Sequence, residues 1–363
     1  MVTLIVVSAI KALIVIGMVL NLAGILGWVE RKGSALIQDR IGANRAAIFG
    51  FAGAGLVNTL LADPIKFLTK EDVIPRGVDR LLHTLAPCVS LFPAIVAFAV
   101  IPFGDRLEIG DLVVNLQAVE VDVGVLFLLA MTSLGVYGVV LGGWASNNRL
   151  SLLGGIRGSA QMISYELAMG LSVAAVVLTF GSLDFQEIVR SQGRMIGGWI
   201  PAWGIWYQPV AFVLLLIAGI AETKRAPFDL PEGESEIVSG YFTEYSGIKY
   251  LMFFMTDFVE IAVVSAVVTT FFFGGWQVPF LTAEGFVFPW GWSLALPHIV
   301  VVLLQVLSYM VKVFVFCCLQ VLVRWTMPRL RYDQLMWFGW KVMLPIGLAN
   351  LVLTAAVLLW VRG

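Results

Sequence analysis

Long apolar stretches separated by polar segments dominate this sequence. An α-helix needs about 20 predominantly apolar residues to cross a bilayer. Runs of this kind lie near residues 3–28, 83–103, 122–143, 160–180, 207–223, 248–273, 297–325 and 338–361. The pattern predicts an all-α protein, a polytopic transmembrane helical bundle with about eight spans. We expect a single transmembrane domain over residues 1–363, with large polar loops at 30–80 and 222–247.

One stretch leaves the number of spans open. Residues 49–67 are rich in glycine and apolar side chains, but Asn58, Asp63 and Pro64 interrupt them. The stretch fits either a ninth spanning helix or an amphipathic helix that lies at the membrane interface.

Composition supports a membrane protein. Hydrophobic residues make up 60% of the chain and charged residues 13%, and the mean hydropathy is +0.92. Soluble proteins carry about 25% charged residues. The first span has no basic flank before it and no small-residue cleavage site after it, which favours a retained helix over a signal peptide.

The positions of Lys and Arg predict the orientation, because basic loops face the cytoplasm. The inner loops would hold Arg31, Lys32, Arg40, Arg45, Lys66, Lys70, Arg76 and Arg80, then Arg149 and Arg157, then Lys224, Arg225 and Lys249, then Arg324, Arg329 and Arg331. The opposite side would hold only Arg106, Arg190, Arg194 and Arg362. We therefore expect a multi-pass membrane protein with both termini on the outer side.

Few side chains are suited to holding a redox cofactor. An iron–sulfur cluster needs about four thiolates and a membrane haem needs an axial pair, but the chain has three cysteines and two histidines. His83 and His298 begin spans that start on opposite sides of the membrane. Neither glycine pair, Gly142-Gly143 or Gly154-Gly155, is followed by the Lys-Ser/Thr of a phosphate-binding loop. We expect no metal and no bound redox cofactor on this chain.

The segment from Glu222 to Glu236 places a cluster of charges directly after an apolar run. Residues 222–247 hold two bases and six acids, a net charge of −4, whereas residues 30–80 hold eight bases and six acids, a net charge of +2. We expect the two loops to be electrostatic complements. Crowded, partly desolvated carboxylates bind protons more readily, which favours a proton-handling loop. The alternative is an acidic surface that docks a basic partner.

Several ionisable residues lie well inside predicted spans, among them Lys11, Glu166, Asp257, Glu260 and Lys312. Asp257 and Glu260 are three residues apart and share one helix face. Long lysine side chains reach the interface by snorkelling, which explains Lys11 and Lys312. It explains the short carboxylates poorly, so we interpret the acids as part of a polar path.

Ordered motifs between residues 28 and 345 make the chain similar to a known family. They are Glu30-Arg31-Lys32, Gln38 to Asn44, Asp63-Pro64-Ile65-Lys66, Lys70-Glu71, Gly143 to Asn148, Gln161 to Glu166, Glu222 to Glu236, Gly240-Tyr241, Glu244-Tyr245 and Pro328 to Leu335. The chain resembles the H subunit of bacterial respiratory complex I, the counterpart of mitochondrial NADH dehydrogenase subunit 1.

The resemblance implies a membrane subunit of a proton-pumping NADH:quinone oxidoreductase, whose loops at 30–80 and 222–247 line a quinone tunnel. It assigns quinone contacts to Arg31, Arg40, Asp63, Lys66, Arg157, Arg225 and Arg324. It assigns a catalytic proton path to Glu166, Glu222, Glu232, Glu234, Glu236, Glu244 and Asp257.

The same resemblance implies cofactors and partners. Quinone would be the substrate, while iron–sulfur clusters and flavin would lie on partner subunits. The expected partners are the iron–sulfur and quinone-site subunits of the hydrophilic arm, small membrane subunits, antiporter-like subunits and the lipid bilayer, with no nucleic acid. The electron donor and the quinone type stay open.

Three positions depart from the family pattern. Ala43 stands where proline is usual, so we expect a more mobile turn there. Lys224 stands where Asn is usual, and we expect its charge to favour the ionised form of Glu222. Asp257 stands where Glu is common, which keeps the carboxylate on a shorter side chain.

Three other functions remain as alternatives. The nearest is the anchor subunit of a membrane-bound hydrogenase or formate hydrogenlyase, which would share the fold but bind no quinone. A free-standing secondary transporter predicts inverted repeats, and the sequence shows no convincing repeat. A purely structural anchor leaves the acids inside the spans unexplained.

Overall fold

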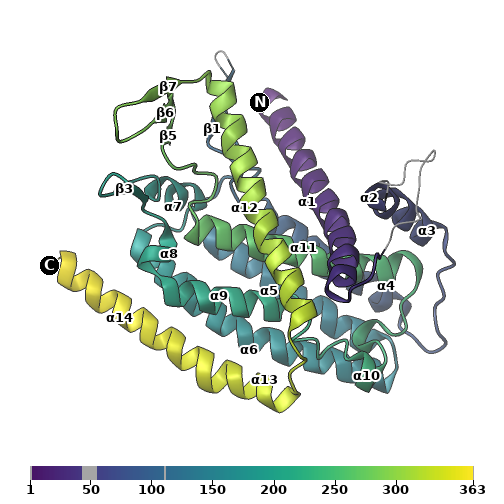
Figure 1. Cartoon of the computed structure of the whole chain (residues 1–363). Helices are drawn as coiled ribbons and strands as arrows, with labels where there is room; N and C mark the ends of the chain where they lie inside the picture. The colour runs from purple at the N-terminus through teal and green to yellow at the C-terminus, as the bar shows by residue number, and fades with distance from the viewer. Residues whose placement is uncertain (1, 43–54, 110–111, 363) are drawn as a thin grey trace.

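The protein is a bundle of long helices with small sheets at one end (Figure 1). The structure, a computed structural model, describes the backbone of residues 2–42, 55–109 and 112–362. Within these ranges seven helical segments are long and apolar enough to cross a membrane. They are α1 (Val2–Ile37), α4 (Arg80–Phe98), α5 (Gly124–Ala145), α6 (Arg149–Phe180), α11 (Gly247–Phe272), α12 (His298–Thr326) and the continuous run α13 (Tyr332–Phe338), η3 (Gly339–Met343) and α14 (Leu344–Arg362). The all-α polytopic fold is confirmed.

The predicted span at 207–223 is shorter than a full crossing. It forms α9 (Pro209–Glu222), with the one-turn helix α8 (Gly204–Tyr207) before it. Proline at position 209 disfavours helical backbone at Gln208, whose φ of −135° and ψ of 57° separate the two helices. At 1.5 Å per residue, α9 alone extends about 21 Å, less than the roughly 30 Å hydrocarbon core.

Short helices fill the segments between the long ones. They are α2 (Gly55–Val57), the π-helix η1 (Asn58–Ala62), α3 (Asp63–Thr69), α7 (Phe185–Ser191), α10 (Glu234–Ile237) and the 3₁₀-helix η2 (Gly240–Phe242). Part of the predicted helix at 49–67, and Ala43, lie outside the described residues. The described part, residues 55–69, is a continuous helical run of the segments α2, η1 and α3 beside α1 and α11. At about 22 Å it is too short to span a bilayer alone.

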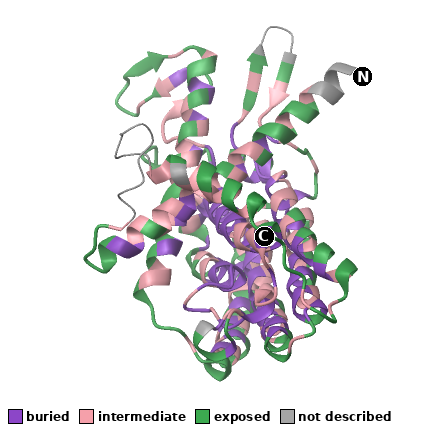
Figure 2. Ribbon diagram, turned by 90° about the vertical axis from the view of Figure 1, so that its right-hand side faces the viewer, coloured by how far each residue is buried: buried purple, intermediate pink, exposed green. Residues whose placement is uncertain are grey.

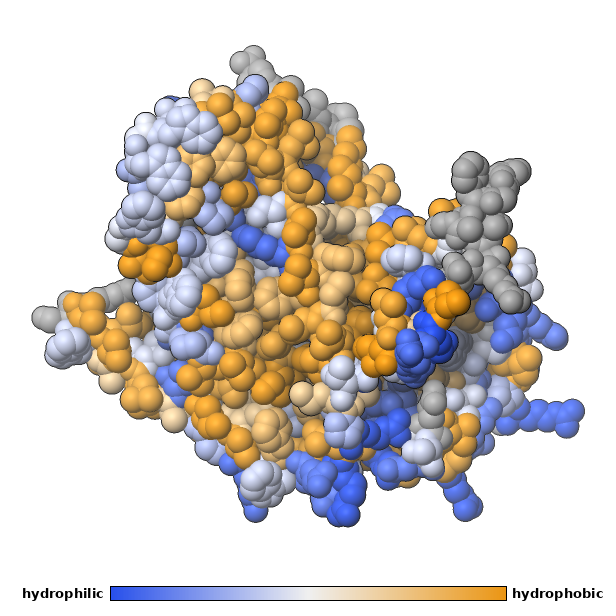
Figure 3. Space-filling model, viewed as in Figure 1, coloured by the Kyte–Doolittle hydropathy of each residue, from blue (hydrophilic) through white to orange (hydrophobic). Residues whose placement is uncertain are grey.

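Two ends of the bundle differ in character. The hairpin end comprises residues 101–109, 112–123, 181–208 and 273–297. Its antiparallel pairs are β1 (Arg106–Ile109) with β2 (Leu112–Asn115), β3 (Met195–Ile196) with β4 (Ile200–Pro201), and β5 (Leu281–Thr282) with β6 (Gly285–Val287) and β7 (Ser293–Ala295). The loop end comprises residues 30–42, 55–80, 146–148, 223–246 and 327–331. Figure 3 shows an apolar band across the bundle and hydrophilic residues gathered toward the loop end.

Two long helices begin or end beyond their predicted bounds. The helix predicted from residue 160 begins at Arg149, where Asn148 caps it by accepting a hydrogen bond from the Leu150 backbone N–H at 2.9 Å. The helix predicted to end near residue 28 continues to Ile37. Arg157, Glu30 and Arg31 therefore lie on helices, and not in loops as the hydropathy pattern predicted.

Helix α11 lies at the centre of the bundle. Every residue from Ile261 to Phe272 is buried, as expected for a helix that is apolar on all sides. Buried residues concentrate in the bundle, while the hairpins are more exposed (Figure 2). Close packing at the loop end depends on glycine, because a Cβ at Gly154 of α6 would lie 2.7 Å from the Gly240 Cα.

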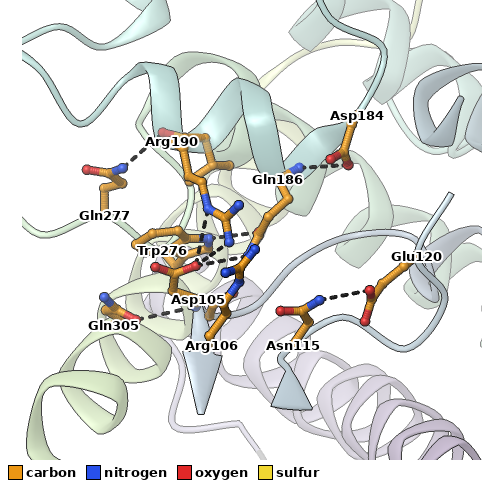
Figure 4. Close-up of polar contacts among 12 residues, drawn as sticks. Asp105, Arg106, Asn115, Glu120, Asp184, Gln186, Arg190, Trp276, Gln277 and Gln305 are labelled. Atoms are coloured by element: carbon orange, nitrogen blue, oxygen red, sulfur yellow. Dashed lines mark hydrogen bonds and ion pairs between the residues drawn. The ribbon is translucent and has the colours of Figure 1, made fainter. Parts of the chain in front are cut away.

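A hydrogen-bonded network holds the hairpin end together (Figure 4). The Asp105 carboxylate accepts hydrogen bonds from Arg190 at 2.7 Å and from Gln186 at 3.4 Å. The Trp276 indole N–H donates to the Gln186 Oε1 atom at 3.2 Å, and the Asp105 backbone N–H donates to Gln305 at 3.3 Å. This network joins the β1 segment, α7, the segment after α11 and α12.

The two lysines inside spans have different surroundings. Lys11 forms an ion pair with Glu120 at 3.3 Å, in keeping with a side chain that reaches the interface. The Lys312 ammonium instead donates to three backbone carbonyls, those of Phe273 at 2.9 Å, Gly275 at 3.0 Å and Gln277 at 2.7 Å. Lys312 therefore caps the chain that leaves α11, a role that snorkelling did not predict.

Candidate functional site

Glu30 is the centre of a cluster of charges at the loop end. Its carboxylate accepts hydrogen bonds from Arg225 and from Arg324, one on each oxygen. The Arg225 guanidinium also lies 3.9 Å from the centre of the Phe258 ring, in cation–π contact. One carboxylate thus joins two guanidinium groups beside an aromatic wall.

A cavity of about 580 Å³ lies next to this cluster, between α1, the η1–α3 segment and α11. Its polar side is formed by Arg31, Asp63 and Lys66, and Arg31 and Asp63 form an ion pair at 2.6 Å. The rest of the lining is mainly apolar or aromatic, including Leu20, Leu60, Phe67, Leu91, Leu251, Phe254, Met255 and Phe258. Such a cavity suits a ligand with a polar head and an apolar body.

A second cluster lies between the end of α9 and α11. The Lys224 ammonium contacts the Glu260 carboxylate at 2.8 and 3.0 Å and the Asp257 Oδ1 atom at 3.4 Å. Lys224 is 0% exposed and Asp257 3% exposed. Burial disfavours the ammonium, but the two carboxylates outweigh burial and hold the pKa of Lys224 above its ordinary value.

Further acids continue from this cluster in two directions. Glu222, 8% exposed, interacts electrostatically with Glu260 and Glu166. The Ser133 hydroxyl donates to the Glu166 carboxylate. On the other side, Asp257 interacts with Glu232, so a series of neighbouring carboxylates runs from the 222–247 loop into the bundle.

Glu232 connects the two clusters. Burial raises the pKa of Glu232 well above its ordinary value, and the nearby Asp257 and Asp229 carboxylates raise it further, against the opposing effect of Arg225 and Arg324. A carboxyl group in this setting binds a proton more readily at neutral pH than a solvated glutamate does.

Comparison with known proteins identifies the family. The family model described as NADH dehydrogenase matches residues 10–355. The chain belongs to the NADH dehydrogenase family. It is 44% identical over 92% of its length to the NADH-quinone oxidoreductase H subunit 1 of Cytophaga hutchinsonii, covering 91% of that protein. It is 45% identical over 97% of its length to the NADH-quinone oxidoreductase H subunit 2 of Geobacter sulfurreducens, covering 96% of that protein.

A third relative carries a related name. NADH-quinone oxidoreductase subunit 8 of Rhodothermus marinus is 45% identical over 96% of this chain and 96% of its own length. The resemblance to the complex I H subunit is thus confirmed, and the names of these relatives do not favour a hydrogenase anchor.

Within this member of the NADH dehydrogenase family, the predicted site residues fall into separate groups. Arg31, Asp63 and Lys66 line the 580 Å³ cavity, and Arg225 and Arg324 contact Glu30 beside it. Glu166, Glu222, Glu232 and Asp257 belong to the series of buried or partly buried carboxylates.

The other predicted residues lie apart from both groups. Arg40 is exposed, and its Nε atom donates to Gln38 at 2.7 Å. Arg157 and Glu236 form an ion pair at 2.7 Å, and Glu244 accepts a hydrogen bond from Asn148 at 2.6 Å. The side chain of Glu234 lies outside the described residues.

The expected complementarity of the two loops takes a different form. The bases in the ion pairs between the two loops come from the acidic loop and its surroundings. Arg225 pairs with Glu30, and Lys249, just after the 222–247 loop, pairs with Asp72 at 2.9 Å. Acids of the 222–247 loop pair with Arg157 on α6 and with Arg329, which contacts Asp229 at 2.6 Å. Net charge per segment did not reveal these partners.

Three site residues were absent from the predicted set: Glu30, Lys224 and Glu260. Glu260 shares a helix face with Asp257, and that spacing could have added it to the set. Lys224 was recognised as a departure from the family pattern, but its ammonium faces Glu260 and Asp257 more directly than Glu222. Glu30 was noted only within the Glu30-Arg31-Lys32 motif, and its two partners lie 195 and 294 residues away along the sequence.

Proposed function

We propose that this chain, a membrane subunit of an NADH-quinone oxidoreductase, holds quinone in the 580 Å³ cavity and couples its reduction to the series of buried carboxylates. The cavity carries the proposal, because it combines an apolar wall with Arg31, Asp63 and Lys66. The apolar wall would accept an isoprenoid tail, and the polar side would contact the quinone head.

Reduction of a quinone to a quinol takes up two electrons and two protons. In this proposal the electrons come from an iron–sulfur cluster on a neighbouring subunit of the hydrophilic arm, where flavin and the other clusters also reside. Phe254 and Phe258 line the cavity and also contact Arg225. A change of charge in the cavity therefore acts on Arg225 and Glu30, and through them on Glu232.

The carboxylates then carry the effect into the bundle. The proposed order is Glu232, Asp257, Glu260, Glu222 and Glu166, each interacting with the next. Shifting the proton affinity of one group by one pKa unit corresponds to about 1.4 kcal/mol. Moving one charge across 100 mV requires about 2.3 kcal/mol. Changes of one pKa unit at a few of these groups would therefore supply energy comparable to that needed to move a proton across the membrane.

The surroundings follow from the same proposal. The chain would be a multi-pass protein of the bacterial inner membrane, with the loop end facing the cytoplasm under the hydrophilic arm. Both termini would face the periplasm, and small membrane subunits and antiporter-like subunits would contact the bundle.

Purification of the complex from native membranes tests the function. We expect the chain to co-purify with iron–sulfur subunits and the complex to oxidise NADH only when quinone is supplied. Cysteine labels at 104–121 or 274–296 should react from outside, and labels at 70–80 or 326–334 from the cytoplasm. A complex that evolves hydrogen without quinone, or reversed labelling, would contradict the proposal.

A further inference from the structure

Lys224 is a fully buried cation inside a series of acids. It lies just past the C-terminal end of α9, with a φ of 57°, and its side chain lies between α9 and α11. Its ammonium contacts both Asp257 and Glu260, which the three-residue spacing places on one face of α11.

The contacts among Lys224, Asp257 and Glu260 determine how many protons the two carboxylates can bind. Two carboxylates side by side in a buried site do not both stay ionised without a compensating cation. With Lys224 charged, the group has a net charge of −1 when both carboxylates are ionised and zero when one proton is bound. The lysine thus allows Asp257 and Glu260 to alternate between these two states.

The position of this group divides the series of acids. Asp257 interacts with Glu232 on the loop side, and Glu260 interacts with Glu222 on the bundle side. The other ionisable groups that face it are Arg225, Tyr241 and, beyond Glu222, Glu166.

A small cavity of about 20 Å³ is lined by both Glu260 and Glu222. This volume suffices for about one water molecule. Ser90 also lines the cavity, and its hydroxyl is buried without a hydrogen-bond partner in the described protein. A water there would give Ser90 a partner and connect the two carboxylates.

We propose that Lys224 is a positioning residue that holds Asp257 and Glu260 as a one-proton station between Glu232 and Glu222. This inference rests on the proposed function, since it concerns the transfer of protons along the same series. The proton arrives from the Glu232 side, binds to the pair of carboxylates, and leaves through the small cavity toward Glu222, which restores the charge of −1.

The test uses the assembled complex in proteoliposomes, with NADH and quinone supplied, and measures protons pumped per electron as a function of pH. Lys224→Met removes the cation, so the ionised carboxylates beside it lose their compensating charge. We expect the pH optimum of pumping to move to higher pH by about 1 to 3 units. Lys224→Arg keeps the cation and should retain a profile near that of the wild type. Lys11→Met, which removes a lysine at the hairpin end, is the matched control and should leave the profile unchanged.

The outcomes separate this inference from the proposed function. An unchanged pH profile in Lys224→Met would show that Lys224 does not hold Asp257 and Glu260 as a one-proton station. If Glu222→Gln is impaired in the same assay, the proposed function still stands. Normal pumping by Glu222→Gln would instead contradict the proposed function itself. Lys224→Gln is a second neutral variant. If neither neutral variant assembles while Lys224→Arg does, Lys224 serves folding alone and the inference is wrong.

Discussion

Matched ion pairs at the hairpin end differ from the buried cluster of charges toward the loop end. At the hairpin end, the Asp105–Arg190 and Lys11–Glu120 pairs match one acid to one base. Toward the loop end, the carboxylates of Glu30, Glu222, Glu232, Asp257 and Glu260 lie among the bases Lys224, Arg225 and Arg324.

The difference shows which polar groups fix the structure and which are suited to exchanging protons. A matched pair has one preferred protonation state, so it joins elements without responding to a neighbouring reaction. Buried carboxylates that interact with one another release their protons in coupled steps. A charge that appears nearby can then shift the balance among them.

The largest effect on assembly is expected from Lys312→Met at the hairpin end. The change leaves the carbonyls of Phe273, Gly275 and Gln277 without their donor. Each unsatisfied buried polar group costs about 1–3 kcal/mol. With three such carbonyls, we expect the free energy of unfolding to fall by at least about 3 kcal/mol. The amount of complex in membranes and its thermal inactivation temperature test this prediction. Turnover per assembled complex should be unchanged. Normal assembly at the wild-type inactivation temperature would refute the capping role.

A smaller, pH-dependent effect is expected from Glu232→Gln. Because the pKa of Glu232 is raised, its carboxyl group stays protonated to a higher pH than a solvated glutamate. Glutamine mimics the protonated form but cannot pass a proton on, so the variant should pump less than the wild type. The deficit should widen as pH rises through the raised pKa of Glu232, because there the wild-type carboxyl group releases its proton more readily. Pumping rates between about pH 6 and pH 9 measure this.

Glu236→Gln is the control for that experiment, because Glu236 is exposed and paired with Arg157. Its pH profile should follow the wild type. Equal profiles for Glu232→Gln and Glu236→Gln would place Glu232 outside the proton-handling series.

The smallest effect is expected from Arg31→Ala. This change removes one polar contact from the edge of the 580 Å³ cavity, and a partly exposed polar contact contributes about 1 kcal/mol. The apparent KM for quinone should rise about fivefold, with protons pumped per electron unchanged. Arg40→Ala should leave the KM unchanged, because Arg40 is exposed and pairs with Gln38. A larger effect of Arg40→Ala would place the quinone elsewhere.

The sequence predicted what depends on local spacing and missed what depends on distant contacts. Hydropathy predicted the long helices, and the three-residue spacing of Asp257 and Glu260 predicted their shared face, which Lys224 contacts. The helical continuation to Ile37 and the start at Arg149 were missed, because polar residues there form helix that packs against other elements. The assignment of Arg31 and Asp63 to one site rested on the family resemblance alone, and their ion pair was not predicted.

Charge pairing was the least predictable feature. A carboxylate pairs with whichever base the fold brings near it, and the net charge of a loop does not encode that choice. Glu30 therefore pairs with Arg225 and Arg324, which lie far away in the sequence. The net charges of the two loops predicted the reverse, with bases of the 30–80 loop attracting acids of the 222–247 loop.

Glu222→Gln tests the central claim most directly. Glutamine is nearly isosteric with glutamate and keeps hydrogen-bonding capacity, so the change removes proton exchange more than shape. With normal amounts of assembled complex, the account predicts that quinone reduction and proton pumping fall together, by about tenfold or more if the site carries at least 1.4 kcal/mol of the coupling. Glu222→Asp should retain more of both activities. If Glu222→Gln membranes reduce quinone and pump protons at wild-type rates, Glu222 is a structural charge and the proton path is wrong.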